Sequence, residues 1–101
     1  WQGYQQLKQS GLKVVGIFIL PPSKKELIKR LKSRGRDTST EMRKRMSLAQ
    51  DEISHFPEYD YVVINNDLNF CSSQILNIIA SERLKKSNQF NLTNFVNRFR
   101  D

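Results

Sequence analysis

Two short apolar runs and several amphipathic segments alternate along the chain. The runs, residues 13–20 (KVVGIFIL) and 61–64 (YVVI), are rich in β-branched residues. Such runs are typical of strands that are buried on both faces of a parallel sheet. A Pro-Pro pair ends the first run, and an Asn-Asn-Asp turn follows the second. Because parallel strands need a crossover connection, the helical pattern between the two runs predicts an α/β fold.

The crossover between the runs contains two predicted helices. Each begins with a capping box, in which a Ser or Thr side chain accepts a backbone hydrogen bond and a Glu side chain returns one. The capping pairs are Ser23 with Glu26 and Thr38 with Glu41. We expect helices over about 24–34, where Gly35 fits a stop, and over about 39–54.

Further helices are predicted on either side of this unit. They span residues 1–10, about 69–86, and a last segment from about 91. The second of these places Cys71 on an apolar stripe, so we expect this thiol to lie in the core. The last one repeats apolar residues at the helical period, after a short hinge at residues 87–89.

The chain is expected to form one incomplete domain. Its parts are 1–22 (core helix and strand), 23–54 (the helical crossover, called the arm below), 55–86 (core strand and helix) and 87–101 (helical tail). Two strands do not make a stable sheet by themselves, so each needs neighbours. Since the chain opens on Trp1 instead of Met, we expect the missing strands to precede it.

The positive charge is concentrated in the arm. Of the formal net charge of +7, all the excess falls in residues 24–45, which hold ten basic and three acidic residues. A concentrated positive segment raises the local concentration of anions. Three interpretations remain open from charge alone: a solvated helix face, a phosphate-binding element and a nucleic-acid patch.

Composition removes several classes of protein. The longest apolar run is far shorter than the roughly 18 residues of a membrane helix, so no membrane partner is expected. The single cysteine excludes an internal disulfide and fits a reducing compartment, which predicts a cytoplasmic protein. One His and one Cys exclude the usual zinc sites, and we expect His55 to pack or hydrogen-bond.

Arginines and lysines separate on the arm helices when drawn at about 100° per residue. Arg30 and Arg34 lie at the edge of the apolar stripe of the first helix, while its lysines lie on the far side. Arg45 lies about 60° from the centre of the stripe on the second helix. That stripe consists of Met42, Met46, Ala49 and Ile53. Arginine at such a margin suits bidentate binding of phosphate, pairing with a carboxylate of its own domain, or burial of its apolar stem with the charged group in water.

The arm also leaves the sheet where ligands usually bind. In open α/β sheets, ligands lie outside the carboxyl ends of the strands. Residues 20–22 and 65–67 form those ends here, so the arm is placed to fold over an anionic ligand.

The sequence from residue 21 to 67, PPSKKELIKRLKSRGRDTSTEMRKRMSLAQDEISHFPEYDYVVINND, strongly resembles the lid and following strand of bacterial-type guanylate kinases. The motifs WQG, FILPPS and SERL fit the same family, and the resemblance extends over about residues 1–86. It implies a partial P-loop kinase fold with parallel strands, a helical lid crossover and C-terminal helices. It further implies transfer of the γ-phosphoryl group of ATP to GMP, with Mg²⁺.

The resemblance also implies roles for four residues. Lid arginines of this family close on the phosphates, and the matching positions are Arg30, Arg34 and Arg45. Arg34 would face the ATP phosphates, Arg45 would bridge donor and acceptor phosphates, and Arg30 would assist on the donor side. Asn65 would help to seat the adenine.

The P-loop itself does not occur in residues 1–101. Without a G-x-x-x-x-G-K-[ST] loop nothing cradles the β-phosphate, and the family's GMP-binding residues also precede the WQG motif. We therefore expect the chain alone to be inactive, to need a missing amino-terminal half, and to leave most Mg²⁺ ligands to that half.

Two alternatives compete with the kinase. A non-catalytic guanylate-kinase-like interaction domain would have no use for the arginines. A nucleic-acid-binding module predicts aromatic residues among residues 24–45, and there are none, so nucleic acid is an unexpected partner.

Overall fold

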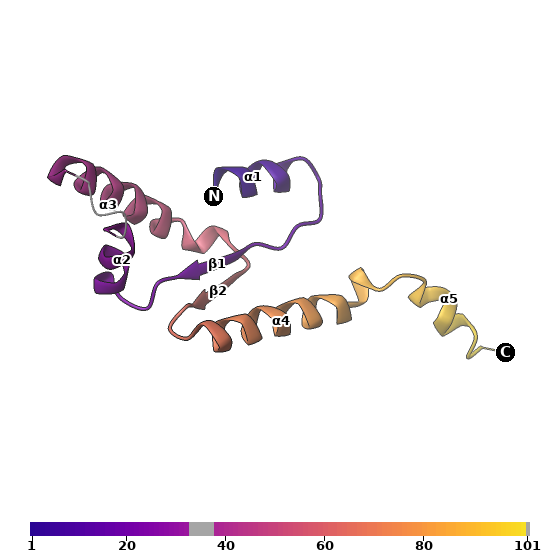
Figure 1. Cartoon of the computed structure of the whole chain (residues 1–101). Helices are drawn as coiled ribbons and strands as arrows, with labels where there is room; N and C mark the ends of the chain where they lie inside the picture. The colour runs from indigo at the N-terminus through magenta and orange to yellow at the C-terminus, as the bar shows by residue number, and fades with distance from the viewer. Residues whose placement is uncertain (33–37, 101) are drawn as a thin grey trace.

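The computed structural model describes residues 1–32 and 38–100. Figure 1 shows two strands set among helices, which confirms the predicted α/β class. The elements are α1 (Gln2–Gln9), β1 (Ile17–Leu20), α2 (Lys24–Leu31), α3 (Ser39–Ser54), η1 (Phe56–Glu58), β2 (Tyr61–Ile64), α4 (Leu68–Leu84), η2 (Lys86–Asn88) and α5 (Leu92–Asn97).

Strands β1 and β2 pair in parallel, and the arm connects them. The register runs from Ile17 opposite Tyr61 to Leu20 opposite Ile64. The prediction of a strand over 13–20 is wrong at its start, because β2 offers only four partner residues. At the amino end of β1 the pairing goes no further than Gly16. The Gly16 carbonyl accepts the N–H groups of residues 60 and 61 at 3.0 and 3.1 Å.

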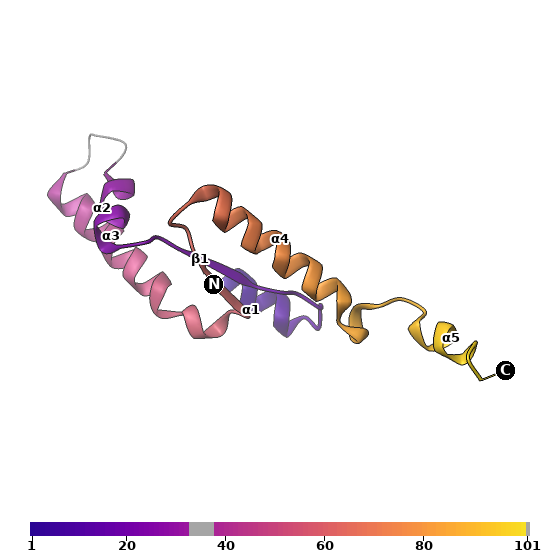
Figure 2. The same cartoon turned by 90° about the horizontal axis from the view of Figure 1, so that it is seen from below.

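The prediction that both strands are buried on both faces is also wrong for this chain. Val63 and Cys71, which are 5% and 3% exposed, form the buried apolar core among the described residues. Ile19, on the same face as Val63, is 47% exposed, and Val62 and Ile64, on the other face, are 42% and 55% exposed. Neither face is therefore fully covered. Helix α4 lies along the strands (Figure 2) and contributes Cys71 to the core, as predicted.

The shape of the chain reflects this small core. Its accessible surface is 8464 Å², whereas a compact domain of this mass exposes about 5,900 Å². Its radius of gyration is 19.4 Å, against about 13 Å for a compact domain of about 100 residues. In Figure 1, α5 extends away from the rest of the chain beyond α4. Much apolar surface is therefore left without cover.

Local signals set where the helices begin. At α3 the predicted capping box is complete: the Glu41 N–H donates to Thr38 Oγ1 at 3.2 Å, and the Thr38 N–H donates to Glu41 Oε2 at 3.3 Å. At α2 only half of the predicted capping box forms: Ser23 Oγ accepts the Glu26 N–H at 3.1 Å, but the Glu26 side chain does not return a bond to the Ser23 N–H. Helix α4 begins where Asp67 Oδ1 accepts the N–H of residue 69 at 2.8 Å.

The helix ends were predicted less well. Helix α2 ends at Leu31, and Gly35, the predicted stop, lies outside the described residues. Helix α4 ends at Leu84, two residues before the predicted end. Two of its last four carbonyls find partners there, because the side-chain amides of Asn88 and Gln89 donate to the carbonyls of residues 82 and 84 at 2.7 and 2.6 Å.

A tether built on Asp60 holds α1 against the start of β1. Asp60 Oδ2 accepts the Gly16 N–H at 2.8 Å and also the hydroxyl of Tyr4 on α1. The Tyr4 ring stacks on Tyr59, with centroids 5.1 Å apart. At the N-cap of the same helix, the Trp1 ring stacks on an imidazole at 3.6 Å. That imidazole is the side chain of His55, which also bonds Glu58 at 2.9 Å, so it packs and hydrogen-bonds as predicted.

The tether makes stability depend on pH in a defined direction. The Gly16 N–H, and next the Tyr4 hydroxyl, lower the pKa of Asp60. The pKa of Asp60 is lower in the folded protein than in the unfolded one. Its full contribution to the free energy of unfolding is therefore present above pH about 4, and this contribution is lost as the pH falls through the folded pKa. Burial, and next the bond to Asp60, raise the pKa of Tyr4 to about 12. The full contribution of Tyr4 to the free energy of unfolding is therefore present below pH about 10, and it is lost as the pH rises through the folded pKa.

Replacing Asp60 with Asn should lower the free energy of unfolding near neutral pH by about 0.5–1 kcal/mol, a modest loss because water screens this exposed carboxylate. The difference from wild type should shrink in acid, where the wild-type carboxyl group also becomes neutral. Urea unfolding of both proteins at pH about 7 and about 3 measures it. An equal difference at both pH values would contradict a charged tether.

Candidate functional site

The carboxyl ends of β1 and β2 form one edge of the sheet, and Asn65 lies on it. Its backbone N–H donates to the carbonyl of Leu20 at 2.8 Å, which extends the strand pairing by one residue. Asn65 is half-buried, and Asp67 follows it to cap α4. The arm leaves the sheet from this edge (Figure 1), where ligands of open α/β sheets bind.

The two arm helices pack on each other along the apolar stripes that the sequence predicted. On α3 every member of the stripe is half-buried: Met42, Met46, Ala49 and Ile53. On α2 the half-buried positions include Leu27 and Leu31. The arm is thus a helical hairpin whose basic residues lie beside or opposite a shared apolar seam.

Arg45 on α3 reaches across this seam to the end of α2. Its Nη1 donates to the carbonyl of Leu31 at 3.3 Å, and the side chain is half-buried. The last carbonyls of a helix lack partners within the helix and carry partial negative charge, so a guanidinium group is favourable there. This contact sets the position of the Arg45 guanidinium group relative to α2.

Arg30 directly precedes Leu31 in the last turn of α2, and its side chain is exposed. The structure therefore brings Arg30 and Arg45 to the same end of the arm, although Arg45 lies 14 positions after Leu31 in the sequence. Arg34 lies outside the described residues. Asn65 belongs to the strand edge and not to the arm.

The described part of the arm is strongly basic. Between residues 24 and 45 it holds eight Lys and Arg residues against two Glu residues, and Glu41 is engaged in the capping box. In contrast, residues 1–32 and 38–100 contain no group of three or more His, Cys, Asp or Glu side chains that would suit a metal ion. The arm therefore suits anionic phosphates, and the described residues do not fit as a complete Mg²⁺ site.

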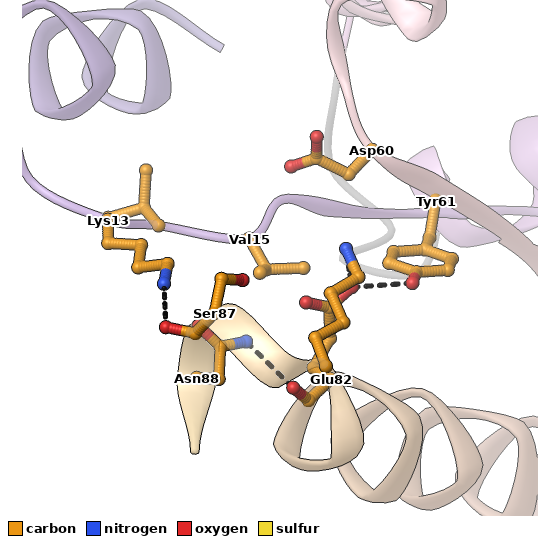
Figure 3. Close-up of a pocket in the computed structure, with 9 residues that line it drawn as sticks. Lys13, Val15, Asp60, Tyr61, Glu82, Ser87 and Asn88 are labelled. Atoms are coloured by element: carbon orange, nitrogen blue, oxygen red, sulfur yellow. Dashed lines mark hydrogen bonds and ion pairs between the residues drawn. The ribbon is translucent and has the colours of Figure 1, made fainter. Parts of the chain in front are cut away.

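A pocket of about 470 Å³ lies at the opposite edge, by the amino ends of the strands (Figure 3). Its polar groups bond one another. The Tyr61 hydroxyl donates to Glu82 Oε1 at 2.5 Å, and Lys85 pairs with the same oxygen at 3.0 Å. Lys13 Nζ donates to the carbonyl of Ser87 at 2.7 Å. These bonds join the end of α4 to the sheet, so we interpret this pocket as structural.

Sequence reasoning missed the polar contacts around this pocket. Residues 61–64 were treated only as an apolar run, yet the bond from the Tyr61 hydroxyl lowers the pKa of the Glu82 carboxyl group. Lys13 and Ser87 are 74 positions apart. A single sequence holds no local signal that would pair residues at such distances.

No helix within the described ranges has the length and apolar character needed to cross a membrane.

Comparison with known proteins adds a family to this geometry. The family model described as guanylate kinase matches residues 1–82. The chain is 46% identical over 101 residues to the guanylate kinase of Paramagnetospirillum magneticum, covering 99% of this chain and 47% of that protein. It is 47% identical over 97 residues to the guanylate kinase of Bradyrhizobium diazoefficiens, covering 95% of this chain and 44% of that protein. The chain thus spans less than half the length of these curated relatives.

Proposed function

Because the chain belongs to the guanylate kinase family, we propose that it is part of an enzyme that transfers the γ-phosphoryl group of ATP to GMP, giving ADP and GDP. In this proposal the arm is the lid of the kinase. The observation that carries it is the position of Arg45, which bonds the carbonyl at the end of α2, in the helical turn that carries Arg30, on a basic arm that rises from the carboxyl edge.

The proposed chemistry matches what arginines do. Phosphoryl transfer needs reactants in line and charge neutralised on the moving group, and little covalent help from the protein. Arg45 would bridge the donor and acceptor phosphates, while Arg30 and Arg34 would bind the donor phosphates. Closure of the arm would bring these donors to the phosphates and exclude water. Asn65, on the edge below the arm, would help to seat the adenine.

Mg²⁺ would enter with ATP and neutralise charge on its phosphates. The described residues do not provide a complete set of ligands for the ion, so its protein ligands would come from elsewhere in the kinase. No step of the proposed mechanism on this chain runs through the metal.

We further propose that the amino-terminal half of the same kinase covers the strands. The chain exposes about 2,500 Å² more than a compact domain of its mass, and Ile19, Val62 and Ile64 are part of that surface. Exposed apolar patches of this kind mark surfaces that pack against further protein. The P-loop and the GMP site would lie in that half.

A transplant tests the proposed function. The matching segment of the Paramagnetospirillum magneticum kinase is replaced with this chain, and ADP formation from ATP and GMP is measured in a coupled assay. We expect the chimera to phosphorylate GMP, and the isolated chain to show no turnover. A second chimera that exchanges only residues 23–54 tests the arm if the larger exchange does not fold.

Two results would contradict the proposal. Failure of a folded arm chimera to turn over would argue against a functional lid. Turnover by the isolated chain that survives further purification would show that no other half is required.

A further inference from the structure

The far side of α2 from the arginines carries a separate group of charges. Lys25, Lys29 and Lys32, called the lysine face below, lie together on the helix wheel, and all three side chains are exposed. The proposed lid chemistry uses the arginines and leaves the lysine face without a role.

The lysine face is not neutralised within the described chain. None of its three ammonium groups forms an ion pair with a carboxylate in residues 1–32 or 38–100. Other lysines do have partners: Lys85 pairs with a carboxylate at 3.0 Å, and Lys13 donates to a carbonyl at 2.7 Å. The lysine face therefore adds three uncompensated charges to the field of the arm.

The lysine face and the arginine edge of α2 are too far apart to bind the same phosphate. A helix with its side chains is about 10 Å across, so lysines on the far side cannot reach a phosphate that the arginine edge holds. Electrostatic attraction persists over about 8 Å at physiological salt and over about 30 Å at low salt. The lysine face therefore acts on a nucleotide through its long-range field, during approach, and not through direct contact with the bound phosphates.

We infer that the lysine face steers anionic nucleotides toward the carboxyl edge, increasing the rate of their association without touching them. This inference rests on the proposed function, since it assumes that nucleotides bind beneath the arm. Focused positive fields raise association rates of anions by about 10- to 1000-fold, and three lysines supply part of such a field.

The test uses the full-length kinase with Lys25, Lys29 and Lys32 all replaced by Gln. Stopped-flow mixing with a fluorescent N-methylanthraniloyl derivative of ATP gives association and dissociation rates from about 20 to about 300 mM salt. We expect association at low salt to slow by about 3- to 10-fold and its salt dependence to flatten. The dissociation rate and kcat should stay at the wild-type values.

A matched control removes the same charge elsewhere. Arg83, Lys86 and Arg100 are exposed and lie outside the arm, and their replacement by Gln should slow association less than the arm variant. An equal effect of the two triple variants would mean that only net charge matters, and would overturn the inference. Faster dissociation with unchanged association would also overturn it, because it would indicate direct contact.

The two proposals fail in different ways. Normal turnover of GMP by wild type, with association unchanged in the lysine variant, would overturn the steering role alone. A folded full-length protein that neither binds the ATP derivative nor phosphorylates GMP would overturn both.

Discussion

Replacing Arg45 with Ala in the full-length kinase should reduce kcat by a factor on the order of 10³. The guanidinium group is held at the end of α2 by its bond to the Leu31 carbonyl, so in the proposed closed arm it meets the phosphates already oriented. Its removal takes away a hydrogen-bond donor that stabilises the transition state, in which negative charge is spread over the phosphoryl group in transfer. Steady-state kinetics with ATP and GMP measure the loss.

Two companion variants separate catalysis from folding. Lys44→Ala removes a charge from the adjacent, exposed position of α3, and kcat should stay within about twofold of wild type, as expected for a solvated lysine. Arg45→Lys keeps the charge but loses the planar guanidinium group that can donate two hydrogen bonds to one phosphate, so its kcat should stay well below wild type. Equal small effects of Arg45→Ala and Lys44→Ala would defeat the assignment of the arm as a lid.

The substitution Gly16→Ala should destabilise the fold by about 1–3 kcal/mol, as overpacking of a close contact does. A Cβ at Gly16 would lie 2.5–2.9 Å from three ring atoms of Tyr4. The ring cannot move away without cost, because it stacks on Tyr59 and its hydroxyl donates to Asp60. The midpoint of urea unfolding reports the change.

A double-mutant cycle identifies the clash as the cause. With Tyr4 replaced by Ala the space beside Gly16 is empty, so Gly16→Ala should then cost less than about 0.5 kcal/mol. The same cost in both backgrounds would show that the ring contact does not limit this position.

Much of the local structure could be predicted because its causes are local. The capping box of Thr38 and Glu41 sets the start of α3, and both partners lie within one turn. The apolar period of α3 likewise predicts its half-buried stripe. The edge position of Asn65 followed from the order of strand and turn, since parallel strands end at the same edge.

Predictions that needed a partner from elsewhere in the chain were less successful. The run 13–20 has strand character throughout, yet only Ile17–Leu20 pair, because the length of β2 limits the ladder. Apolar character likewise predicted two buried faces, while Val62 and Ile64 remain exposed. Composition indicates which side chains favour burial, but burial also requires something to cover them.

The sequence by itself determined the type and order of the α-helices and strands, the basic character of the arm, and the family. These follow from short-range periodicity and from ordered motifs, which the linear chain carries directly. Only the tertiary structure decided that Arg45 bonds the end of α2, that Asp60 joins α1 to Gly16, and that Glu82 holds Tyr61. Such contacts join residues 14 to 56 positions apart, and they depend on where the backbone brings each side chain after folding.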